Sequence, residues 1–259
     1  MKDVLLRAGL TGAARQLVLY WILPIAVLAL WYSVTAAGLV QDYAMPSPGK
    51  VLQTAGGMAL DGSLAAHLIA SITRVLEGFL LAAVCALAVG IAAGLVSGFE
   101  RFTDLVMQIL KPIPPIAWIP MAILWFGIEE ASKIYIIFIG AFFPIFLNTL
   151  NGIRNIDKKY LELAKVYEVP RWRVIRKVIL PGALPFVMTG LRLGLAGAWI
   201  CVVAAEMIAA VNGIGYMLMD ARSLSRPDIV ILGMLLIGLI GKLMDDGVLL
   251  LEKKLISWR

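Results

Sequence analysis

The chain has 259 residues, of which 61% are hydrophobic and only 15% are charged, and its mean hydropathy is +0.91. Because soluble globular domains usually carry about 25% charged residues, this composition excludes an ordinary soluble domain and indicates a membrane protein. The net charge of +6 is interpreted as a topology signal, since basic residues gather in cytoplasmic loops, and no nucleic-acid partner is expected.

Six stretches of the chain are predominantly apolar over roughly the 20 residues that a helix needs to cross the hydrocarbon core of a bilayer. The first two carry no charged residue, whereas the last two are interrupted by isolated charges. We therefore predict an all-α integral membrane protein with six transmembrane helices in a single domain, residues 1–259. The expected spans are residues 16–41, 78–99, 106–128, 134–153, 183–211 and 228–251.

The distribution of basic residues predicts the orientation in the membrane. With the N-terminus inside, most of the 23 Lys and Arg residues fall in inner segments, from Lys2 and Arg7 to a large group in residues 154–182. We therefore expect both termini in the cytoplasm. The first apolar run exceeds the roughly 7 to 15 residues of a secretory signal core, so it is interpreted as a span. Residues 42–66, rich in Pro, Gly and small polar residues, predict an outer loop with one short helix near 49–60.

Small residues recur every four positions through the second expected span. This spacing keeps them on one ridge of a helix, where another helix backbone can approach closely and gain van der Waals contact that lipid would not supply. The partner is either another helix of the same bundle or a helix at a moving or dimeric interface. The residues are Gly78, Ala82, Ala86, Gly90, Gly94 and Gly98.

Prolines crowd the start of the third expected span. Each one removes a backbone donor and clashes with the preceding turn, so this span should be broken or kinked. A kink alone is one reading, and a broken helix that lines a wet transport pathway is the other. The prolines are Pro112, Pro114, Pro115 and Pro120.

A charged insert, residues 154–182, separates the fourth and fifth expected spans. Residues 158–167 and a second segment from Pro170 each place apolar residues on one helical face and charges on the other. Proline disfavours helical geometry in the residue before it, so the two helices should meet at Glu168-Val169. A basic inner loop would explain the charges alone, whereas a partner protein would also explain the amphipathic pattern and Trp172. The pattern predicts a cytoplasmic helix-turn-helix that binds a partner.

The insert resembles the EAA loop of the membrane subunits of bacterial ABC importers, which reads EAA, three residues, Gly, nine residues, Ile-X-Leu-Pro. Glu162-Leu163-Ala164, Glu168 and Val178-Ile179-Leu180-Pro181 match this spacing throughout. Leu163, Val178 and Glu168 depart from the usual residues. Since the usual Gly forms the turn between the two coupling helices, Pro170 is a candidate to form it here.

Nearly the whole chain is similar to the permease branch that serves nitrate, taurine, aliphatic sulfonates and bicarbonate. The resemblance implies a type I permease of the bacterial inner membrane that works as a homodimer with two ATPase subunits and an extracytoplasmic binding protein. The cargo implied is a small anionic solute. Beyond the insert, the matching segments are residues 67–75, 111–120, 125–128 and 203–208.

The resemblance also implies which residues of the insert contact the ATPase. The chain has no GxxxxGK[ST] phosphate loop, so ATP and Mg should be bound by the partner ATPase subunits and no cofactor by this chain. We expect no catalytic residue and no metal site, because Cys85 and Cys201 lie in spans without metal or redox spacing. The predicted coupling residues are Glu162, Leu163, Ala164, Glu168, Pro170, Arg171, Arg173, Leu180 and Pro181.

Ionisable side chains at membrane depth are costly and are therefore candidates for a translocation pathway. Arg192, Trp199 and Glu206 are seven residues apart and share one stripe of the fifth span. Glu206 either belongs to a pathway or makes a structural hydrogen bond to a neighbouring span. Arg74 either pairs with Glu77 or forms an anion entry site. The predicted pathway residues are Arg74, Trp118, Arg192, Trp199 and Glu206, with Trp118 alternatively an interface anchor.

Two function classes remain after this reading. The first is an ATP-driven importer, in which ATPase closure moves the insert and reorients the spans. The second is an ion-gradient-driven secondary transporter or channel, for which the broken third span and Glu206 would be the evidence. An intramembrane enzyme is set aside because the sequence has no HExxH or GxSxG motif.

Overall fold

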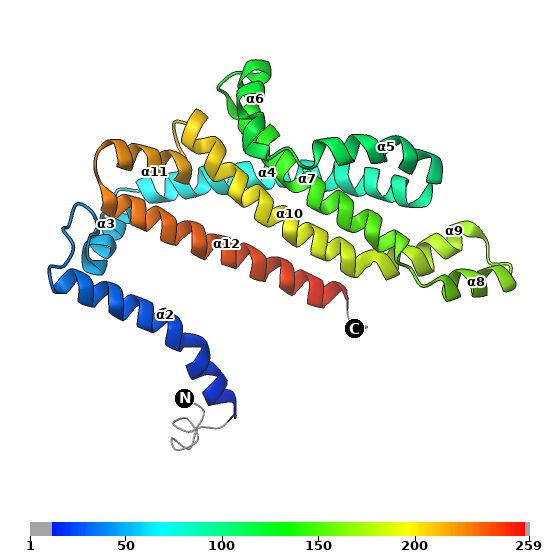
Figure 1. Ribbon diagram of the computed structural model, residues 1–259, viewed down its shortest axis with the longest axis horizontal. Helices are drawn as coiled ribbons and strands as arrows, with labels where there is room; N and C mark the ends of the chain where they lie inside the picture. The colour runs from blue at the N-terminus through cyan, green and yellow to red at the C-terminus, as the bar shows by residue number, and fades with distance from the viewer. Residues whose placement is uncertain (1–11, 257–259) are drawn as a thin grey trace.

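The computed structural model describes residues 12–256, and throughout this range the secondary structure is helical (Figure 1). Lys2 and Arg7, on which part of the predicted orientation rests, lie outside the described residues. The α-helices are α2 (Gly12–Ala36), α3 (Pro48–Leu60), α4 (Ser63–Leu95), α5 (Ser97–Leu110), α6 (Ile119–Phe126), α7 (Glu130–Arg154), α8 (Lys158–Val166), α9 (Arg171–Val174), α10 (Leu180–Ala209), α11 (Ile214–Ser223) and α12 (Pro227–Leu255), with a 3-10 turn η1 (Pro115–Trp118) and a π segment η2 (Ile175–Ile179).

The connection after the first span contains the predicted short helix. Helix α3 begins at Pro48, and the Ser47 side chain caps it by accepting from the backbone N–H of Lys50. In the turn to α4, Ser63 donates its N–H and hydroxyl to Asp61, which lowers the pKa of Asp61 below its usual value. The α3 prediction is confirmed, because the observed helix covers residues 49–60.

Helix α4 is longer than the predicted span, residues 78–99. It begins at Ser63 and ends before Val96, whose extended backbone breaks the helix. A Cβ placed on Gly78 would lie 2.6 Å from Ile137 Cγ2, and one on Gly94 would lie 2.8 Å from Ile153 Cγ2, so the small-residue ridge packs against α7 within the chain. The prediction that this ridge packs against another helix of the same bundle is confirmed. Gly98 is the exception, because it lies in α5 and an added Cβ there would have no neighbouring atom within 4 Å.

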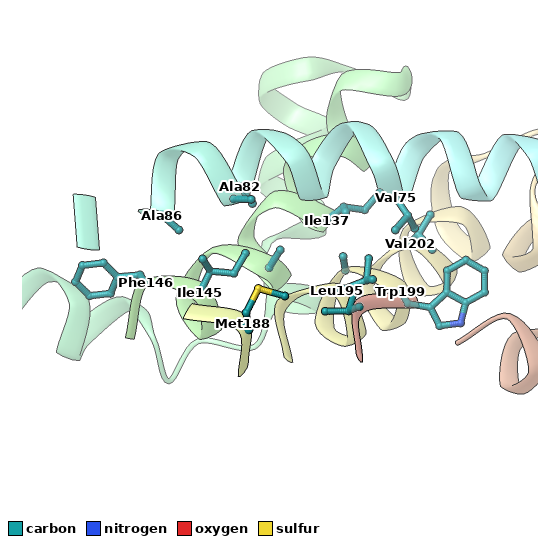
Figure 2. Packing of buried hydrophobic residues seen from close by; sticks show 14 of the residues in the cluster. Val75, Ala82, Ala86, Ile137, Ile145, Phe146, Met188, Leu195, Trp199 and Val202 are labelled. Atoms are coloured by element: carbon teal, nitrogen blue, oxygen red, sulfur yellow. The ribbon is translucent and has the colours of Figure 1, made fainter. Parts of the chain in front are cut away.

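The core lies where α4, α7 and α10 pack together, as Figure 2 shows. Helices α7 and α10 approach closely because glycines face each other: a Cβ on Gly197 would lie 2.5 Å from the carbonyl oxygen of Gly140. Close backbone approach of this kind is how helices gain contact in a bilayer. Residues labelled in Figure 2 are Val75, Ala82 and Ala86 from α4, Ile137, Ile145 and Phe146 from α7, and Met188, Leu195, Trp199 and Val202 from α10.

The third predicted span, residues 106–128, is broken as its prolines predict. Helix α5 ends at Leu110, and the axes of the pair Asp104–Leu110 and Pro115–Phe126 differ by 90°. In the described part of the chain, four helices are long and apolar enough to cross a membrane, or five if this bent pair counts as one span. The apolar part of α2, Tyr20–Ala36, is shorter than those four, so the count of six stays a prediction.

Candidate functional site

The insert forms two short helices at one end of the bundle, as predicted from its amphipathic pattern (Figure 1). Helix α8 begins after Asp157, whose side chain caps it by accepting from the backbone N–H of Lys159 at 2.9 Å. Helix α9 follows after a short turn and continues into α10. The helix-turn-helix is therefore present, and its two helices meet at Glu168-Val169, as predicted.

Glu168 itself makes the turn between these helices. Its φ of 48° places it in the left-handed region, where glycine is preferred. Val169 N–H bonds to Ala164 O at 2.9 Å and Glu168 N–H bonds to Lys165 O at 3.1 Å, the two hydrogen bonds of a Schellman motif. The suggestion that Pro170 supplies the turn is wrong, because Pro170 instead occupies the N-cap position of α9.

The two helices of the insert expose large apolar side chains. Tyr167 and Trp172 are 73% and 60% exposed, and Leu163 is also exposed. A shallow cleft of about 330 Å³ lies between the helices, and Leu163, Ala164 and Arg173 are among its lining residues. We define the coupling surface as the exposed apolar side chains of α8, the following turn and α9: Tyr160, Leu163, Val166, Tyr167 and Trp172.

The other predicted coupling residues surround this surface. Glu162, Glu168, Pro170 and Arg171 are exposed. The Arg171 guanidinium donates to the carbonyl of Leu95 at the end of α4, 3.3 Å away. Leu180 and Pro181 begin α10. All nine predicted residues thus lie on the insert or at its junction with α10.

The insert is joined to α10 without a break. Residues Arg171–Ala209 form a continuous helical stretch of 39 residues. Its π segment includes a hydrogen bond from Leu180 N–H to Ile175 O, five residues back. Pro181, which follows, has no N–H to donate, so the ordinary hydrogen-bond ladder is interrupted there. Helix α9 and α10 therefore form one helical stretch whose hydrogen-bond ladder is weakened at the π segment.

A buried polar cluster occupies the far end of α10 from the insert. Glu206 is 1% exposed, and both of its oxygens accept from Ser71 Oγ at 2.8 Å. The same carboxylate accepts from Arg74 Nη1 at 2.8 Å and from the N–H of Gly215 at 2.9 Å. Of the two roles considered for Glu206, the structural hydrogen bond to a neighbouring span is therefore present. Its pathway role stays a prediction.

Arg74 is the second centre of this cluster. Its Nε and Nη2 donate to the two oxygens of Glu130 at 2.6 and 2.8 Å, and Lys133 donates to the same carboxylate at 2.9 Å. Arg74 also donates to the carbonyl of Asn212 at 2.9 Å. The expected pairing of Arg74 with Glu77 is wrong, because its guanidinium is turned towards α7 and α10. We call Ser71, Arg74, Glu130 and Glu206 the Glu206 cluster.

The Glu206 cluster holds the loop between α10 and α11 in place. Gly213 donates its N–H to His67 Nδ1 at 3.1 Å, and Ile214 donates its N–H to Ser71 Oγ at 2.9 Å. Gly213 has a φ of +111°, and a Cβ there would lie 2.3 Å from the Glu206 carboxyl carbon. Glycine is required at this position on both counts. The sequence does not predict Glu130 as a site residue. Its position at the start of a span is the only feature that could have indicated a role.

A second set of charges lies where α10 and α12 run side by side (Figure 1). The Arg192 guanidinium on α10 forms a two-point pair with the Asp245 carboxylate on α12, with Nη2 to Oδ2 at 2.6 Å and a second hydrogen bond from Nε. On α12, Lys242 pairs with Asp246 one turn along. We define these four residues as the α10–α12 seam.

Trp199 ties the two helices together near this seam. Its Nε1 donates to the carbonyl of Ile237 on α12 at 3.0 Å. A cavity of about 220 Å³ adjoins the ring and is also lined by Arg192, Ala196 and Asp245. The predicted stripe of α10 is thus divided: Arg192 and Trp199 lie at the seam, whereas Glu206 lies in the buried cluster.

Trp118 belongs to neither group. It packs at the break in the third span, against the small core formed by α6, α7 and α10. Among the described buried side-chain polar atoms, its Nε1 is without a hydrogen-bond partner. The described residues contain no group of three or more His, Cys, Asp or Glu placed to hold a metal ion.

Long apolar helices, a broken span and a helical insert with an exposed apolar surface define a multi-pass membrane transport subunit. Residues 86–257 match the family model of the binding-protein-dependent transport system inner membrane component. The chain belongs to this family, in the branch of the sulfonate, taurine and bicarbonate ABC permeases. The family is one of transport permeases rather than enzymes and implies ATPase and substrate-binding protein partners.

Named relatives agree with this assignment, and a solved structure shares the fold. The chain is 43% identical to the putative aliphatic sulfonates transport permease SsuC of Bacillus subtilis (strain 168), over 92% of this chain and 86% of that protein. It is 35% identical to the taurine transport permease TauC of Escherichia coli (strain K12), over 90% and 86%. An inward-facing structure of the MetNI methionine ABC transporter shares the fold, with a TM-score of 0.65 and 16% identity over 76% of this chain and 98% of that one.

Proposed function

We propose that this chain is the membrane-spanning subunit of an ATP-driven importer of a small solute with an anionic group, such as a sulfonate, taurine or nitrate. The observation that carries the proposal is the coupling surface: large apolar side chains are exposed on two short helices, and the second of these helices continues directly into α10. Exposed apolar patches of this kind mark sites of protein association. The family to which the chain belongs makes an ATPase the partner of choice.

The coupling step follows from the continuity of α9 with α10. When two ATPase subunits close on ATP and Mg, they push α8 and α9, and α10 moves with them. The moving helix carries Arg192 and Trp199 past α12 and changes the route between the spans. Alternating access by rigid movement of helices against one another is a general feature of transporters. In this account ATP and Mg are bound by the ATPase subunits alone.

The rest of the assembly is proposed on the same basis. We infer six spans, with α2 as the first and the bent α5–α6 region as the third, and an N-terminus inside, so that the insert and the C-terminus would also be cytoplasmic. A second copy of the chain completes the route, and a binding protein delivers the solute on the other side. The names of the relatives, aliphatic sulfonate and taurine permeases, support an anionic cargo.

Co-purification with the candidate ATPase tests the coupling surface. The variants Glu162→Arg, Ala164→Asp and Trp172→Ala change a charge, the cleft and an exposed aromatic ring of the insert. We expect each to lose the ATPase or to uncouple ATP hydrolysis from the binding protein. Trp125→Ala is the matched control, since Trp125 is similarly exposed but lies on α6. Retention of a fully coupled ATPase by all three variants would contradict the proposal.

A further inference from the structure

The α10–α12 seam lies deep in the membrane if the insert marks the cytoplasmic side. Arg192 is twelve residues along α10 from Leu180, and Asp245 is ten residues from Leu255, the end of α12. At about 1.5 Å per residue these positions are roughly 18 and 15 Å from the inner ends of their helices. The hydrocarbon core is about 30 Å thick. Since α10 and α12, with 30 and 29 residues, are about 45 and 43 Å long and extend beyond this core, the paired charges lie within its inner half.

These charges are not enclosed by the chain itself. The side chains of Arg192 and Asp245 are 40% and 34% exposed, and those of Lys242 and Asp246 are 55% and 44% exposed. Exposure of four charged groups to hydrocarbon at this depth would be costly, so such residues face either water or a protein partner. The cavity of about 220 Å³ beside this pair has two charged lining residues, Arg192 and Asp245, in an otherwise largely apolar wall. It is large enough for on the order of seven waters at about 30 Å³ each.

We infer that the α10–α12 seam lines a water-filled stretch of the translocation route, and that its balanced charge favours a solute carrying both an anionic and a cationic group. The inference rests on the proposed transport function and extends the pathway beyond Arg192 and Trp199 to Lys242, Asp245 and Asp246. Two cations and two anions meet here, and Lys242 and Asp246 also lie within electrostatic range of the Arg192–Asp245 pair.

The preference for a doubly charged solute follows from the geometry of the central pair. Arg192 uses two donors on the carboxylate of Asp245. A simple anion that takes the guanidinium leaves Asp245 without its partner at membrane depth. A zwitterion replaces both partners at once, because its anionic head binds Arg192 while its ammonium group binds Asp245. The exchange then leaves no charge uncompensated.

Thiol labelling tests whether the seam faces water, whatever the cargo. The variant Ala196→Cys places a small probe in the wall of the cavity beside the charged pair, in a chain whose Cys85 and Cys201 are changed to Ala. Leu80→Cys is the matched control, because Leu80 is an exposed apolar residue of α4. Its distance from the Leu95 end of its helix, about 22 Å, is close to the roughly 24 Å of Ala196 from Leu180.

The probe is a membrane-impermeant charged methanethiosulfonate, applied to the assembled transporter in membranes. We expect it to label Ala196→Cys at least about tenfold faster than Leu80→Cys. Equal rates would overturn the inference, because the seam would then be covered by lipid or by a second copy of the chain.

Uptake of two matched solutes tests the preference for a zwitterion. Taurine and ethanesulfonate differ only in the amino group of taurine, and their uptake ratio is measured in vesicles with the ATPase and binding protein. We expect Asp245→Asn to lower the taurine-to-ethanesulfonate ratio at least about fivefold relative to the unmodified chain, while Asp220→Asn, at an exposed position of α11, leaves it unchanged. The same binding protein is present throughout, so its selectivity cancels.

The outcomes separate the two levels of the account. An unchanged ratio in Asp245→Asn would overturn the preference. Uptake of neither solute by the unmodified chain would contradict the proposed cargo together with the preference, whereas the labelling result would still decide whether the seam faces water.

Discussion

Replacing Glu206 with Gln should destabilise the protein because the buried carboxylate is surrounded by donors alone. It accepts from Ser71, Arg74 and Gly215 and is 1% exposed. A Gln side chain keeps the shape but turns one acceptor into an NH₂ group, which faces one of these donors. Breaking a buried ion pair by removing one partner costs about 3–5 kcal/mol. Arg74 keeps Glu130, so we expect the lower end, about 3 kcal/mol.

Thermal unfolding in nanodiscs measures this loss. At roughly 2–4 °C per kcal/mol for a chain of this size, Glu206→Gln should lower Tm by roughly 6–12 °C. Glu77→Gln is the matched control, since Glu77 is exposed on α4 only three residues from Arg74. It should change stability by less than about 0.5 kcal/mol. An unchanged Tm for Glu206→Gln, or an equal loss for Glu77→Gln, would refute the reasoning.

Further predictions concern the glycines of the bundle and the turn of the insert. Gly197→Ala should lower the free energy of unfolding by about 1–3 kcal/mol, because its Cβ would lie 2.5 Å from the carbonyl oxygen of Gly140. Gly247→Ala, with open space around it, should not destabilise the protein, and equal losses in thermal unfolding would contradict the close helix crossing. Glu168→Gly should keep ATPase coupling and stabilise the turn by up to about 1 kcal/mol, while Glu168→Val should destabilise the turn. Amide hydrogen exchange of α8 measures both effects, and faster exchange in Glu168→Gly would count against the left-handed turn.

The elements with local sequence signals were predictable. The insert was found because its amphipathic period, the proline and the EAA spacing all depend on neighbouring residues. The break in the third span followed from its prolines, since each removes a backbone hydrogen bond wherever it falls in a helix. The ridge of small residues on α4 was also predictable, because glycine at every fourth position of a membrane helix has few uses other than close packing.

Features that depend on distant partners could not be predicted. Helix α4 begins fifteen residues before its apolar stretch because His67, Ser71 and Arg74 are satisfied by the α10–α11 loop and α7, and no window of sequence shows those partners. For the same reason the partner of Arg74 was assigned to Glu77, its neighbour in sequence, rather than to Glu130 and Glu206.

The α10–α12 seam shows the same limit. Asp245 interrupts an apolar run, which marks it as unusual, but its pairing with Arg192 joins residues 53 positions apart. A helical stripe predicts that Arg192, Trp199 and Glu206 share one side of a helix. It does not predict that the stripe crosses two different neighbours along its length, α12 at the seam and α4 at the Glu206 cluster.

Uptake of a radiolabelled aliphatic sulfonate distinguishes an ATP-driven importer from a secondary transporter. The vesicles contain this chain and its candidate ATPase, with the binding protein outside in excess. Uptake is compared with ATP and Mg supplied to the ATPase side, with a non-hydrolysable analogue, and with a proton or sodium gradient alone. We expect uptake that requires ATP hydrolysis, persists when ionophores collapse ion gradients, and fails with Ala164→Asp. Uptake driven by an ion gradient without ATP would contradict it and would favour a secondary transporter.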